Sequence, residues 1–555
     1  MSTLELYRQK ALKLEPEDNV AVALTDIREG DSVVMEGRIR QIRTHVKAKH
    51  KFALCNFQIG DPVQMYGVLV GEATAFIPEG TAINSSNICH RSSGFGYRSV
   101  SRAWQSHDLA QWRGRMFQGF HRSDGQVGTR NYWLVVPLVF CENRNIRVLQ
   151  EAFEKELLVS QPDPYRAQVA KLVRHYRNGS LGESEDAPIS DHTSSPYPAR
   201  VFPNLDGVKF LTHTLGCGGT RGDAATLCGL LAGYIHHPNV AGATVLSLGC
   251  QNAEVSLLRS ELLKRNPQFD KPLLVFDQQD RQLESVMLRE AIQEIFLGLV
   301  KASELTRAPA PLSALTIGLK CGGSDGFSGI TANPAIGRVS DLVAALGGKS
   351  ILSEFPELCG VEQSLIDRCV DEASAHRFIS LMETYAAKAE AAGSGFDMNP
   401  SPGNIKDGLI TDAMKSAGAA RKGGTSPVTD VLDYPECVVK PGLNLLCTPG
   451  NDVEAVTAQV GAGARIVLFT TGLGTPTGNP IAPVVKLATN SDLARRMNDI
   501  IDIDTGGIIS GDATIIATSD QILEYVIDVA SGIQRTKAEL KGQEDFIPWK
   551  RGVSL

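Results

Sequence analysis

From residue 208 to residue 487, short apolar runs alternate with segments whose apolar residues recur at helical spacing. Eight runs have the length and composition of buried strands: 208–214, 243–248, 273–276, 315–320, 350–353, 443–446, 465–469 and 483–487. Strands that alternate with helices in this way form mainly parallel sheets covered by helices on both faces. The pattern therefore predicts an α/β main body.

The first hundred residues differ, because a short motif recurs in them. The segment "ALTDIREGDSV" at 23–33 returns as "ALCNFQIGDPV" at 53–63 and more loosely as "ATAFIPEGTAI" at 73–83. Each copy is a short strand, a turn that ends in glycine and a β-branched restart, which predicts a small all-β module. We therefore expect an all-β domain at 1–100, a linker at 101–116, a second α/β domain at 117–312 with a polar insertion near 156–206, and a C-terminal α/β domain at 313–555.

Composition narrows the class of protein. Of the 555 residues, 43% are hydrophobic and 21% charged, and the formal charge of −7 argues against a nucleic-acid or anionic-membrane surface. No apolar run reaches the roughly 18 residues that a membrane span needs, and the N-terminal residues lack the apolar core of a secretory signal. Eleven cysteines without regular spacing predict reduced thiols, so we expect a cytoplasmic protein.

The densest polar chemistry lies at 319–337, "LKCGGSDGFSGITANPAIG", between a predicted strand and a predicted helix. Its glycines allow backbone N–H groups to approach a ligand, and the following helix adds its positive N-terminal end. A thiol, two hydroxyls and a carboxylate lie within eight residues, from Cys321 to Ser328. A tight structural turn would explain the glycines alone, so the stretch favours a ligand or metal site.

Other predicted strands also end in polar loops, and ligands of parallel sheets gather at such carboxyl ends. These loops are "HTLGCGGTRGD" (213–223), "LGCQNAE" (248–254), "SEFPELCGVE" (353–362) and "TTGLGTPTGNP" (470–480). A single buried cysteine is usually a small core residue, but Cys217, Cys250 and Cys321 occupy equivalent loop positions, which favours a shared role. The loop "NPSPGNIKDG" (399–408) is either a Pro/Gly connection or a place where Lys406 meets a carboxylate.

Taken together, these motifs resemble the altronate/galactarate dehydratase family over nearly the whole chain. "DNVAVALTDIREGD" and "HKFAL" resemble the N-terminal SAF (β-clip) domain of that family, and "FQGFHRSDGQVGTRNYWLVV" resembles the start of its second domain. The segments "HTLGCG", "LKCGGSDGFSGITANPAIG", "NPSPGN", "KGG", "TTGLGTPTGNP" and "KLATN" resemble its later signatures. Members of the family are hydro-lyases that act on acid sugars.

The chain departs from the family pattern at two places. The SAF module of the family commonly ends in H-x-H-N, but here Asn84 and Ser86 stand where the imidazoles are expected. His90, three residues beyond Asn87, either compensates for them or is an exposed linker histidine. Gln251 replaces a carboxylate that many relatives carry in "GLGCE". These changes bear on metal ligation and substrate more than on the class of reaction.

The resemblance implies metal-assisted dehydration of a sugar acid, with D-altronate expected and 2-keto-3-deoxy-D-gluconate as the product. A base must remove the weakly acidic C2 proton, and the C3 hydroxyl needs an acid or a Lewis acid in order to leave. The family implies Fe(II), or Mn(II) in its place. Because imidazole and thiolate suit iron, we expect the metal ligands to be His213, Cys217 and Cys321, with Cys250 as a further candidate.

For proton transfer we expect His50 and Lys51 of the SAF module, lying over the α/β loops, and His213, because histidine titrates near neutral pH. His50 could equally be a strand histidine whose nitrogens are already bonded. The expected substrate ligands are Arg130, Lys320 and Lys406 for the carboxylate and Ser324, Asp325 and Asn333 for the hydroxyls.

Alternatives remain open. Cys217, Cys250 and Cys321 could instead hold a 4Fe–4S cluster with one open iron. The substrate could be galactarate or another sugar acid, or the chain could be a sulfo-lyase that acts on sulfolactate. A non-catalytic sugar-acid binding protein is the alternative from another class, motivated by Asn84 and Ser86. We also expect a homodimer in which the β modules cover the active sites.

Overall fold

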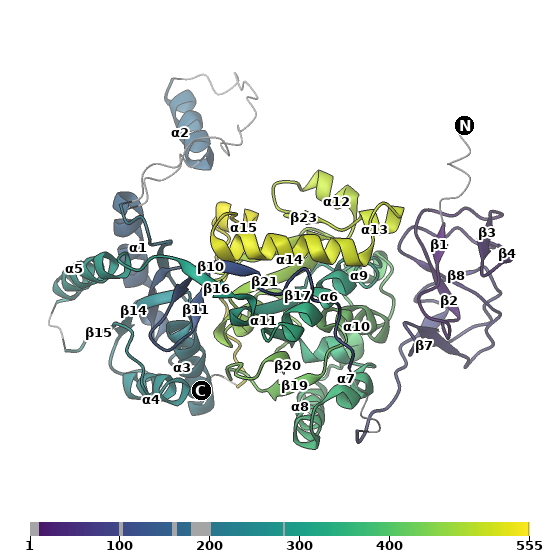
Figure 1. Cartoon of the computed structure of the whole chain (residues 1–555), viewed down its shortest axis with the longest axis horizontal. Helices are drawn as coiled ribbons and strands as arrows, with labels where there is room; N and C mark the ends of the chain where they lie inside the picture. Colours follow the sequence, from purple (N-terminus) through teal and green to yellow (C-terminus); the bar gives the residue numbers. More distant parts are fainter. Residues whose placement is uncertain are drawn as a thin grey trace.

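The computed structural model describes residues 10–98, 104–157, 164–178, 201–280, 283–552 and 554. Figure 1 shows three parts along the long axis: a small β module, a large central α/β domain formed by the C-terminal half, and a second α/β domain at the far end. The predicted α/β body with an all-β N-terminal domain is confirmed. No helix among the described residues is long and apolar enough to cross a membrane.

The N-terminal module is built from short antiparallel strands in the sheets β1-β2-β5-β8, β3-β4 and β6-β7-β9. The strands are β1 (Ala11–Leu12), β2 (Val20–Ala23), β3 (Ser32–Met35), β4 (Arg38–Gln41), β5 (Lys51–Ala53), β6 (Pro62–Met65), β7 (Val68–Ala73), β8 (Ala82–Ile83) and β9 (Ile88–Cys89). The repeated motif forms equivalent turns, because Gly30, Gly60 and Gly80 all have φ between 82° and 90°, which glycine adopts without strain.

A three-stranded antiparallel sheet, β11-β10-β16, follows the linker. Its strands are β10 (Met116–His121), β11 (Val127–Gly128) and β16 (Ala308–Pro311). Since β10 precedes the second α/β domain in the chain and β16 follows it, this sheet clamps the two ends of that domain together.

The second domain has a parallel sheet in the order β13-β12-β14-β15. The strands are β12 (Tyr132–Pro137), β13 (Gly207–Phe210), β14 (Val240–Ser247) and β15 (Leu273–Asp277), and the helical elements are η2 (Phe140–Glu142), α1 (Asn143–Leu157), α3 (Arg221–His236), α4 (Val255–Arg265) and α5 (Glu284–Ala302). Side chains of α1 and α5 pack on one face, around Trp133, and those of α3 and α4 on the other.

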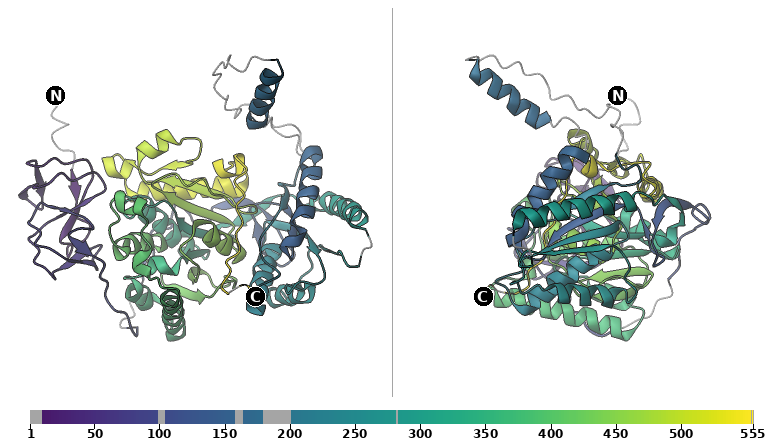
Figure 2. Two further views of the ribbon diagram at one scale, coloured as in Figure 1. Left: turned by 180° about the vertical axis from the view of Figure 1, so that it is seen from behind. Right: turned by 90° about the vertical axis from the view of Figure 1, so that its left-hand side faces the viewer.

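The predicted polar insertion near 156–206 contains a helix that the sequence interpretation missed, α2 (Pro164–Arg177). Both views of Figure 2 show α2 standing away from the body. Residues 158–163 and 179–200 of the insertion lie outside the described residues.

The C-terminal domain has seven parallel strands in the order β19-β20-β18-β17-β21-β22-β23. They are β17 (Thr316–Cys321), β18 (Lys349–Ser353), β19 (Val428–Leu432), β20 (Gly442–Leu446), β21 (Ile466–Thr471), β22 (Val484–Ala488) and β23 (Ile503–Asp504). All eight strands predicted from residue 208 onward are present in the two parallel sheets, whereas β19 and the two-residue β23 were not predicted.

Helices cover both faces of this sheet, and short 3-10 turns lie in the connections between elements. The helices are α6 (Ala332–Ala345), α7 (Glu362–Arg368), α8 (Glu372–Ala391), α9 (Pro402–Lys406), α10 (Asp412–Ala420), α11 (Asp452–Gly461), α12 (Ser491–Arg496), α13 (Gly507–Ser510), α14 (Ile515–Ser531) and α15 (Lys537–Leu540). The 3-10 turns are η3 (Leu312–Ala314), η4 (Phe355–Leu358), η5 (Phe396–Met398) and η6 (Arg421–Gly423). Helices α6 and α14 pack in one core, and α11 packs in the core shared with α3 of the second domain.

Candidate active site

The strand order of the large sheet reverses direction at β17. Outward from β17, the sheet continues with β18, β20 and β19 on one side and with β21, β22 and β23 on the other. Such a reversal leaves a crevice beyond the carboxyl ends of the two strands that flank it, where ligands of α/β proteins bind. Cys321 is the last residue of β17, and Glu354 directly follows β18, its neighbour in the sheet.

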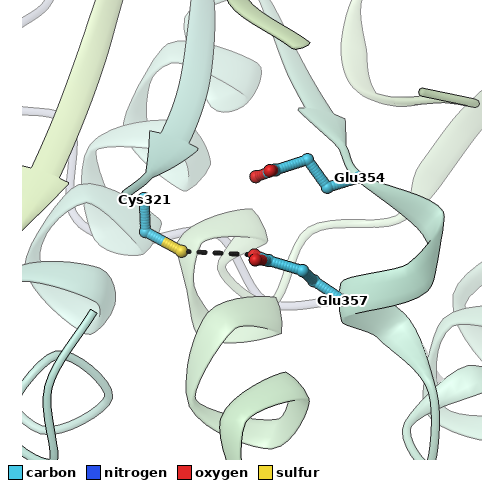
Figure 3. Close-up of side chains that lie close together, drawn as sticks. All are labelled: Cys321, Glu354 and Glu357. Carbon is cyan, nitrogen blue, oxygen red and sulfur yellow. Dashed lines mark hydrogen bonds between the residues drawn. The ribbon is translucent and has the colours of Figure 1, made fainter. Parts of the chain in front are cut away.

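The turn after β18 is unusual. Glu354 has φ 68° and ψ 68°, a left-handed conformation that a residue with a side chain rarely adopts and that costs about 1–3 kcal/mol. The Thr448 hydroxyl fixes the turn by accepting a 2.9 Å hydrogen bond from the Glu354 N–H. The chain then enters η4, which brings Glu357 to the same side as Glu354 (Figure 3).

As a result, one thiol and two carboxylates converge in a buried space. The Cys321 thiol donates a 3.5 Å hydrogen bond to Glu357 Oε2, and the ligand atoms of Cys321, Glu354 and Glu357 all lie within 4.8 Å of one another (Figure 3). Glu354 Oε2 is buried and accepts no hydrogen bond. Among the described residues, this is the one group of at least three His, Cys, Asp and Glu side chains close enough to share a metal ion.

The ammonium group of Lys422 lies among these three acidic groups. Its Nζ is 2.7 Å from Cys321 Sγ, 3.8 Å from Glu357 Oε2 and 3.9 Å from Glu354 Oε2. Lys422 follows α10, in η6, and is almost fully buried. A cation is therefore already favoured at the centre of the cluster.

Two further lysines pair with the carboxylates from outside. Lys320 bonds to Glu354 and lies 2.9 Å from Asp452 Oδ1, while Lys415 Nζ lies 2.9 Å from Glu357 Oε1. The Asp452 side chain retains 32% exposure, against 0% for Glu354 and 6% for Glu357. Asp452 is therefore the acidic side chain through which the cluster reaches solvent.

Burial and charge separate the protonation behaviour of the two glutamates. Burial and the nearby Glu357 raise the pKa of Glu354 to about 7. Burial also opposes ionisation of Glu357, but the Lys415 ammonium and the other lysines hold the pKa of Glu357 well below its usual range. Burial raises the pKa of the Cys321 thiol, and Lys422 opposes that rise.

Gly322 and Gly450 leave room for polar side chains next to the cluster. A Cβ on Gly322 would lie 2.5 Å from both carboxylate oxygens of Asp452, and one on Gly450 would lie 3.0 Å from the Asn399 side chain. Asn399 in turn accepts a hydrogen bond from Lys415. The loop that starts at Asn399 therefore borders the cluster.

The other end of this loop meets the SAF-like module. His50 Nε2 lies 3.0 Å from the carbonyl oxygen of Lys406, and Lys51 Nζ donates a 2.6 Å hydrogen bond to the carbonyl of Gly408. Lys49, which directly precedes His50, forms a 3.0 Å ion pair with Asp325. The module thus lies over the α/β loops, as the sequence predicted.

Burial lowers the pKa of both predicted proton-transfer groups of the module. The pKa of Lys51 falls to about 7 because the side chain is fully buried, although Asp325 opposes the shift. The pKa of His50 also falls through burial, opposed by its bond to the Lys406 carbonyl. The catalytic roles of His50 and Lys51 stay predictions.

The structure does not assemble the predicted metal ligands. Cys217 and Cys250 are exposed in loops at the carboxyl edge of the second domain's sheet, and they do not group with Cys321 among the described residues. His213 uses both ring nitrogens locally: Nε2 lies 2.8 Å from the Pro137 carbonyl and Nδ1 accepts from the Leu215 N–H. The ligand set His213, Cys217, Cys250 and Cys321 is therefore wrong as a set, and the catalytic role of His213 is not supported by its geometry.

Two predicted substrate ligands instead make hydrogen bonds that hold parts of the fold together. Arg130 is buried and donates to both carboxylate oxygens of Glu539 and to the carbonyls of Thr129 and Val529, so it joins the second domain to the C-terminal helices. The Asn333 amide donates to the Gly418 carbonyl and accepts a 2.6 Å bond from the Thr470 hydroxyl. Their own partners leave these side chains unsuited to binding substrate.

Of the remaining predicted ligands, Lys320 is part of the cluster. Ser324 and Asp325 are buried, with the Ser324 carbonyl bonded to Asn404 and the Asp325 carboxylate bonded to Thr489 and Lys49. Lys406 is exposed, and it is its backbone carbonyl that meets His50.

The residues that depart from the family pattern make local contacts. Asn84 and Ser86 form an exposed turn closed by Asn87, where the Asn84 N–H donates to the Asn87 side chain. His90 is half-buried against α10, with Nδ1 3.5 Å from the Ala413 N–H, so it is not an exposed linker residue. Gln251 bonds to the Gly249 N–H and the Ser247 hydroxyl within its own loop.

Sequence reasoning missed most of the cluster. The missed residues are Glu354, Glu357, Lys415, Lys422 and Asp452. A signal for two of them was present, because "SEFPELCGVE" directly follows the predicted strand next to that of Cys321 in the chain. Lys415 carries no comparable signal, because it comes from a helix more than ninety residues further on. Lys422 was noticed only as the start of "KGG" and was not predicted to be a site residue.

Comparisons with known proteins agree with this architecture. Residues 9–91 match the altronate/galactarate dehydratase SAF domain, residues 119–303 the second domain of D-galactarate dehydratase/altronate hydrolase, and residues 312–554 the C-terminal domain of D-galactarate/altronate dehydratase.

Three relatives match almost end to end. The chain is 35% identical to altronate dehydratase of Escherichia coli (strain K12) and 34% identical to altronate dehydratase of Bacillus subtilis (strain 168), in each case over 98% of this chain and 99% of the relative. It is 28% identical to galactarate dehydratase (L-threo-forming) of Escherichia coli (strain K12), over 96% of this chain and 94% of the relative. The chain therefore belongs to the altronate/galactarate dehydratase family and is an altronate dehydratase-like hydro-lyase.

Proposed function

We propose that this chain dehydrates D-altronate to 2-keto-3-deoxy-D-gluconate and water at the Cys321 cluster. The observation that supports the proposal most directly is the buried group of a thiol, two carboxylates and three lysines at the point where the strand order reverses. The end-to-end match to two altronate dehydratases supports the choice of substrate.

The donor set of the cluster fits a divalent cation. Thiolate suits iron and carboxylates suit harder ions, so Cys321, Glu354 and Glu357 would hold Fe(II), or Mn(II) in its place. The unbonded Glu354 Oε2 and the Lys422 ammonium, which lies where positive charge is favoured, support this assignment. When bound, such an ion supplies Lewis acidity toward the substrate carboxylate and a hydroxyl.

A 4Fe–4S cluster does not fit the same site. It needs three or four cysteine thiolates around one centre. Cys217 and Cys250 do not approach Cys321 among the described residues, and the nearest acidic partners of that thiol are glutamates. We therefore propose a mononuclear ion.

The chain's own groups would bind the substrate carboxylate and carry protons. A substrate carboxylate that replaces the half-exposed Asp452 side chain would pair with the Lys320 ammonium. Ser324 and Asp325 lie in the loop that follows Cys321 and stay the proposed contacts for sugar hydroxyls. His50 and Lys51 are the proposed proton-transfer groups, because the Lys51 pKa of about 7 suits a base that works near neutral pH.

The experiment is an anaerobic activity panel on the full chain. Purified protein is given Fe(II), Mn(II), Mg(II) or chelator and offered D-altronate, galactarate, D-mannonate or sulfolactate, with 2-keto-3-deoxy acid and sulfite measured separately. We expect Fe(II)-dependent turnover of D-altronate and its loss in Cys321→Ala. The matched control is Cys89→Ala, at an exposed position of the β module.

The other outcomes would redirect the assignment. Turnover of galactarate or release of sulfite in place of altronate dehydration would change the substrate and keep the site. If no substrate is turned over although metal is bound, the result would favour a sugar-acid binding protein. The reason for considering that class is that Asn84 and Ser86 replace the expected histidines. Full activity in Cys321→Ala would remove the cluster from the mechanism.

A further inference from the structure

A cavity of about 690 Å³ opens between the second domain and the C-terminal domain. Its walls come from α3 and α4 on one side and from the starts of β17 and β18, the end of α11 and residues 435–439 on the other. Thr316 and Lys349, which line it, are the first residues of β17 and β18, whereas Cys321 ends β17. At about 3.3 Å per residue of strand, the cavity lies on the order of 15 Å from the Cys321 cluster, at the opposite edge of the sheet.

The cavity borders a tight joint between the two domains. A Cβ on Gly233 of α3 would lie 2.1 Å from the carbonyl oxygen of Gly461 at the end of α11, so the two helices approach as closely as glycine allows. Both glycines line the cavity. Its shape is therefore set by closely packed backbone.

Arg465 is an unpaired buried cation on the wall of this cavity. The residue is only 5% exposed, and its Nε is buried with no hydrogen-bond partner. Among the described residues its guanidinium forms no ion pair and no hydrogen bond. Asp124 acts on it only at longer range, and the Asp124 carboxylate is already bonded to His236 and Gln126. A buried guanidinium without an acceptor is costly unless a ligand supplies one.

Lys349 adds a second cation with no acidic partner among the described residues. Burial, together with the positive charge of Arg465, lowers the pKa of Lys349, which is the shift expected where two cations share a site without an anion. The two residues are neighbours in the sheet. The backbone N–H of Arg465 donates to the backbone carbonyl of Thr316, and Thr316 of β17 pairs with Lys349 of β18.

The acidic groups on the wall do not neutralise these cations, because they have partners of their own. Glu261 pairs with Lys264 and Arg265, and Glu436 forms two hydrogen bonds with Arg377. The rest of the wall includes apolar side chains such as Pro238, Val438 and Ala462. The cavity thus combines unpaired positive charge with apolar surface, and its volume lies within the range of about 300–1,000 Å³ of small-molecule sites.

We propose that this cavity binds a small organic anion whose carboxylate or phosphate group is held by Arg465 and Lys349. Arginine provides a planar fork that suits either oxyanion, and lysine adds a point charge. Because the walls belong to two domains, the bound anion would also tie those domains together. The site is separate from the proposed dehydration site, so its ligand is an effector or stabilising anion and not the substrate undergoing reaction.

The test is anion titration of the full chain at constant ionic strength, with inorganic phosphate in one arm and citrate in the other, followed by calorimetry and by the thermal unfolding midpoint. An anion that binds the folded state raises the midpoint by mass action. We expect saturable binding of at least one anion, weakened at least tenfold in Lys349→Met. Arg465→Lys keeps the charge but loses the fork, so we expect it to fold and to bind more weakly.

The matched control is Lys440→Met, in which the lost lysine is half-exposed, paired with Asp430 and outside the cavity walls. Anions that bind the lysines of the Cys321 cluster still bind in Lys349→Met, so the component that this variant loses identifies the cavity. The proposal is overturned if neither anion binds saturably, or if Lys349→Met and Lys440→Met bind with equal affinity. Because the readout is binding, the result does not depend on the identity of the sugar acid.

Discussion

The ammonium nitrogen of Lys422 lies 2.7 Å from the thiol sulfur of Cys321, with both side chains almost fully buried. Glu354 and Glu357 lie within 4 Å of the same ammonium. A buried charge cluster of this kind is stable only when its charges balance, because each unpaired ion loses its hydration without compensation. Lys422 and a bound divalent ion would therefore stabilise the same three acidic groups.

Replacing Lys422 with methionine tests whether Lys422 and a metal ion stabilise the same acidic groups. Without the ammonium, the Glu354 and Glu357 carboxylates repel each other, so we expect a lower thermal midpoint in chelator and at least a 100-fold loss of dehydratase activity, or about 3 kcal/mol. Mn(II) should raise the midpoint of Lys422→Met more than that of the wild type, because the ion takes over the missing charge. Differential scanning fluorimetry with and without Mn(II) measures this.

The control for this experiment is Lys440→Met, which removes a lysine at the surface. An equal midpoint shift by Mn(II) in the wild type, Lys422→Met and Lys440→Met would show that the ion binds elsewhere.

The Glu357–Lys415 pair allows a second test, of stability alone. Both side chains are nearly buried and their charged atoms are 2.9 Å apart. Glu357→Met strands the Lys415 ammonium in the interior, and breaking a buried pair in this way costs about 3–5 kcal/mol. We expect the double variant Glu357→Met with Lys415→Met to recover a large part of that loss in urea unfolding. A double variant no more stable than Glu357→Met would mean that the pair is not coupled.

Local sequence pattern predicted the fold well because each βα unit carries its own signal. The apolar runs at 315–320 and 350–353 gave β17 and β18 nearly to the residue. Cys321 and Lys320 were found for the same reason, since both lie at the end of one recognisable strand.

The composition of the site was harder to predict, because it depends on which strands become neighbours. Cys217, Cys250 and Cys321 look equivalent in sequence, since each follows an apolar strand, but the first two belong to a different sheet. Glu354 reaches the site through a left-handed turn that no glycine marks. His213 appeared free to bind a metal because its partners, the Pro137 carbonyl and the Leu215 N–H, are backbone groups that residue type does not reveal.

Lys51 gives a prediction about pH. Its pKa is about 7 in the folded protein, against an ordinary value of 10.5, so between these values the unfolded chain binds a proton that the folded chain does not. Stability from this group therefore rises with pH across that window, by about 1.4 kcal/mol per pH unit, and is lost as pH falls toward 7. We expect urea unfolding at pH 7, 8 and 9 to show a steeper gain for the wild type than for Lys51→Met.

The matched control for the pH experiment is Lys47→Met, at an exposed position in the same segment. It should follow the pH dependence of the wild type. Parallel curves for the wild type and Lys51→Met would show that Lys51 is charged in the folded protein throughout this range.

Gly322 tests the access route to the cluster. A methyl group at this position would lie 2.5 Å from both Asp452 carboxylate oxygens, and since the φ of Gly322 is not positive, the change adds no backbone strain. The partly exposed Asp452 must therefore move away from Lys320, and the new methyl group takes space that the proposed substrate carboxylate would need. For Gly322→Ala we expect KM for the sugar acid to rise about tenfold, equivalent to about 1.4 kcal/mol, with a smaller change in kcat.

Gly94→Ala is the control, because a Cβ there meets nothing within 4 Å. An unchanged KM in Gly322→Ala would place the substrate entrance away from Asp452 and Lys320.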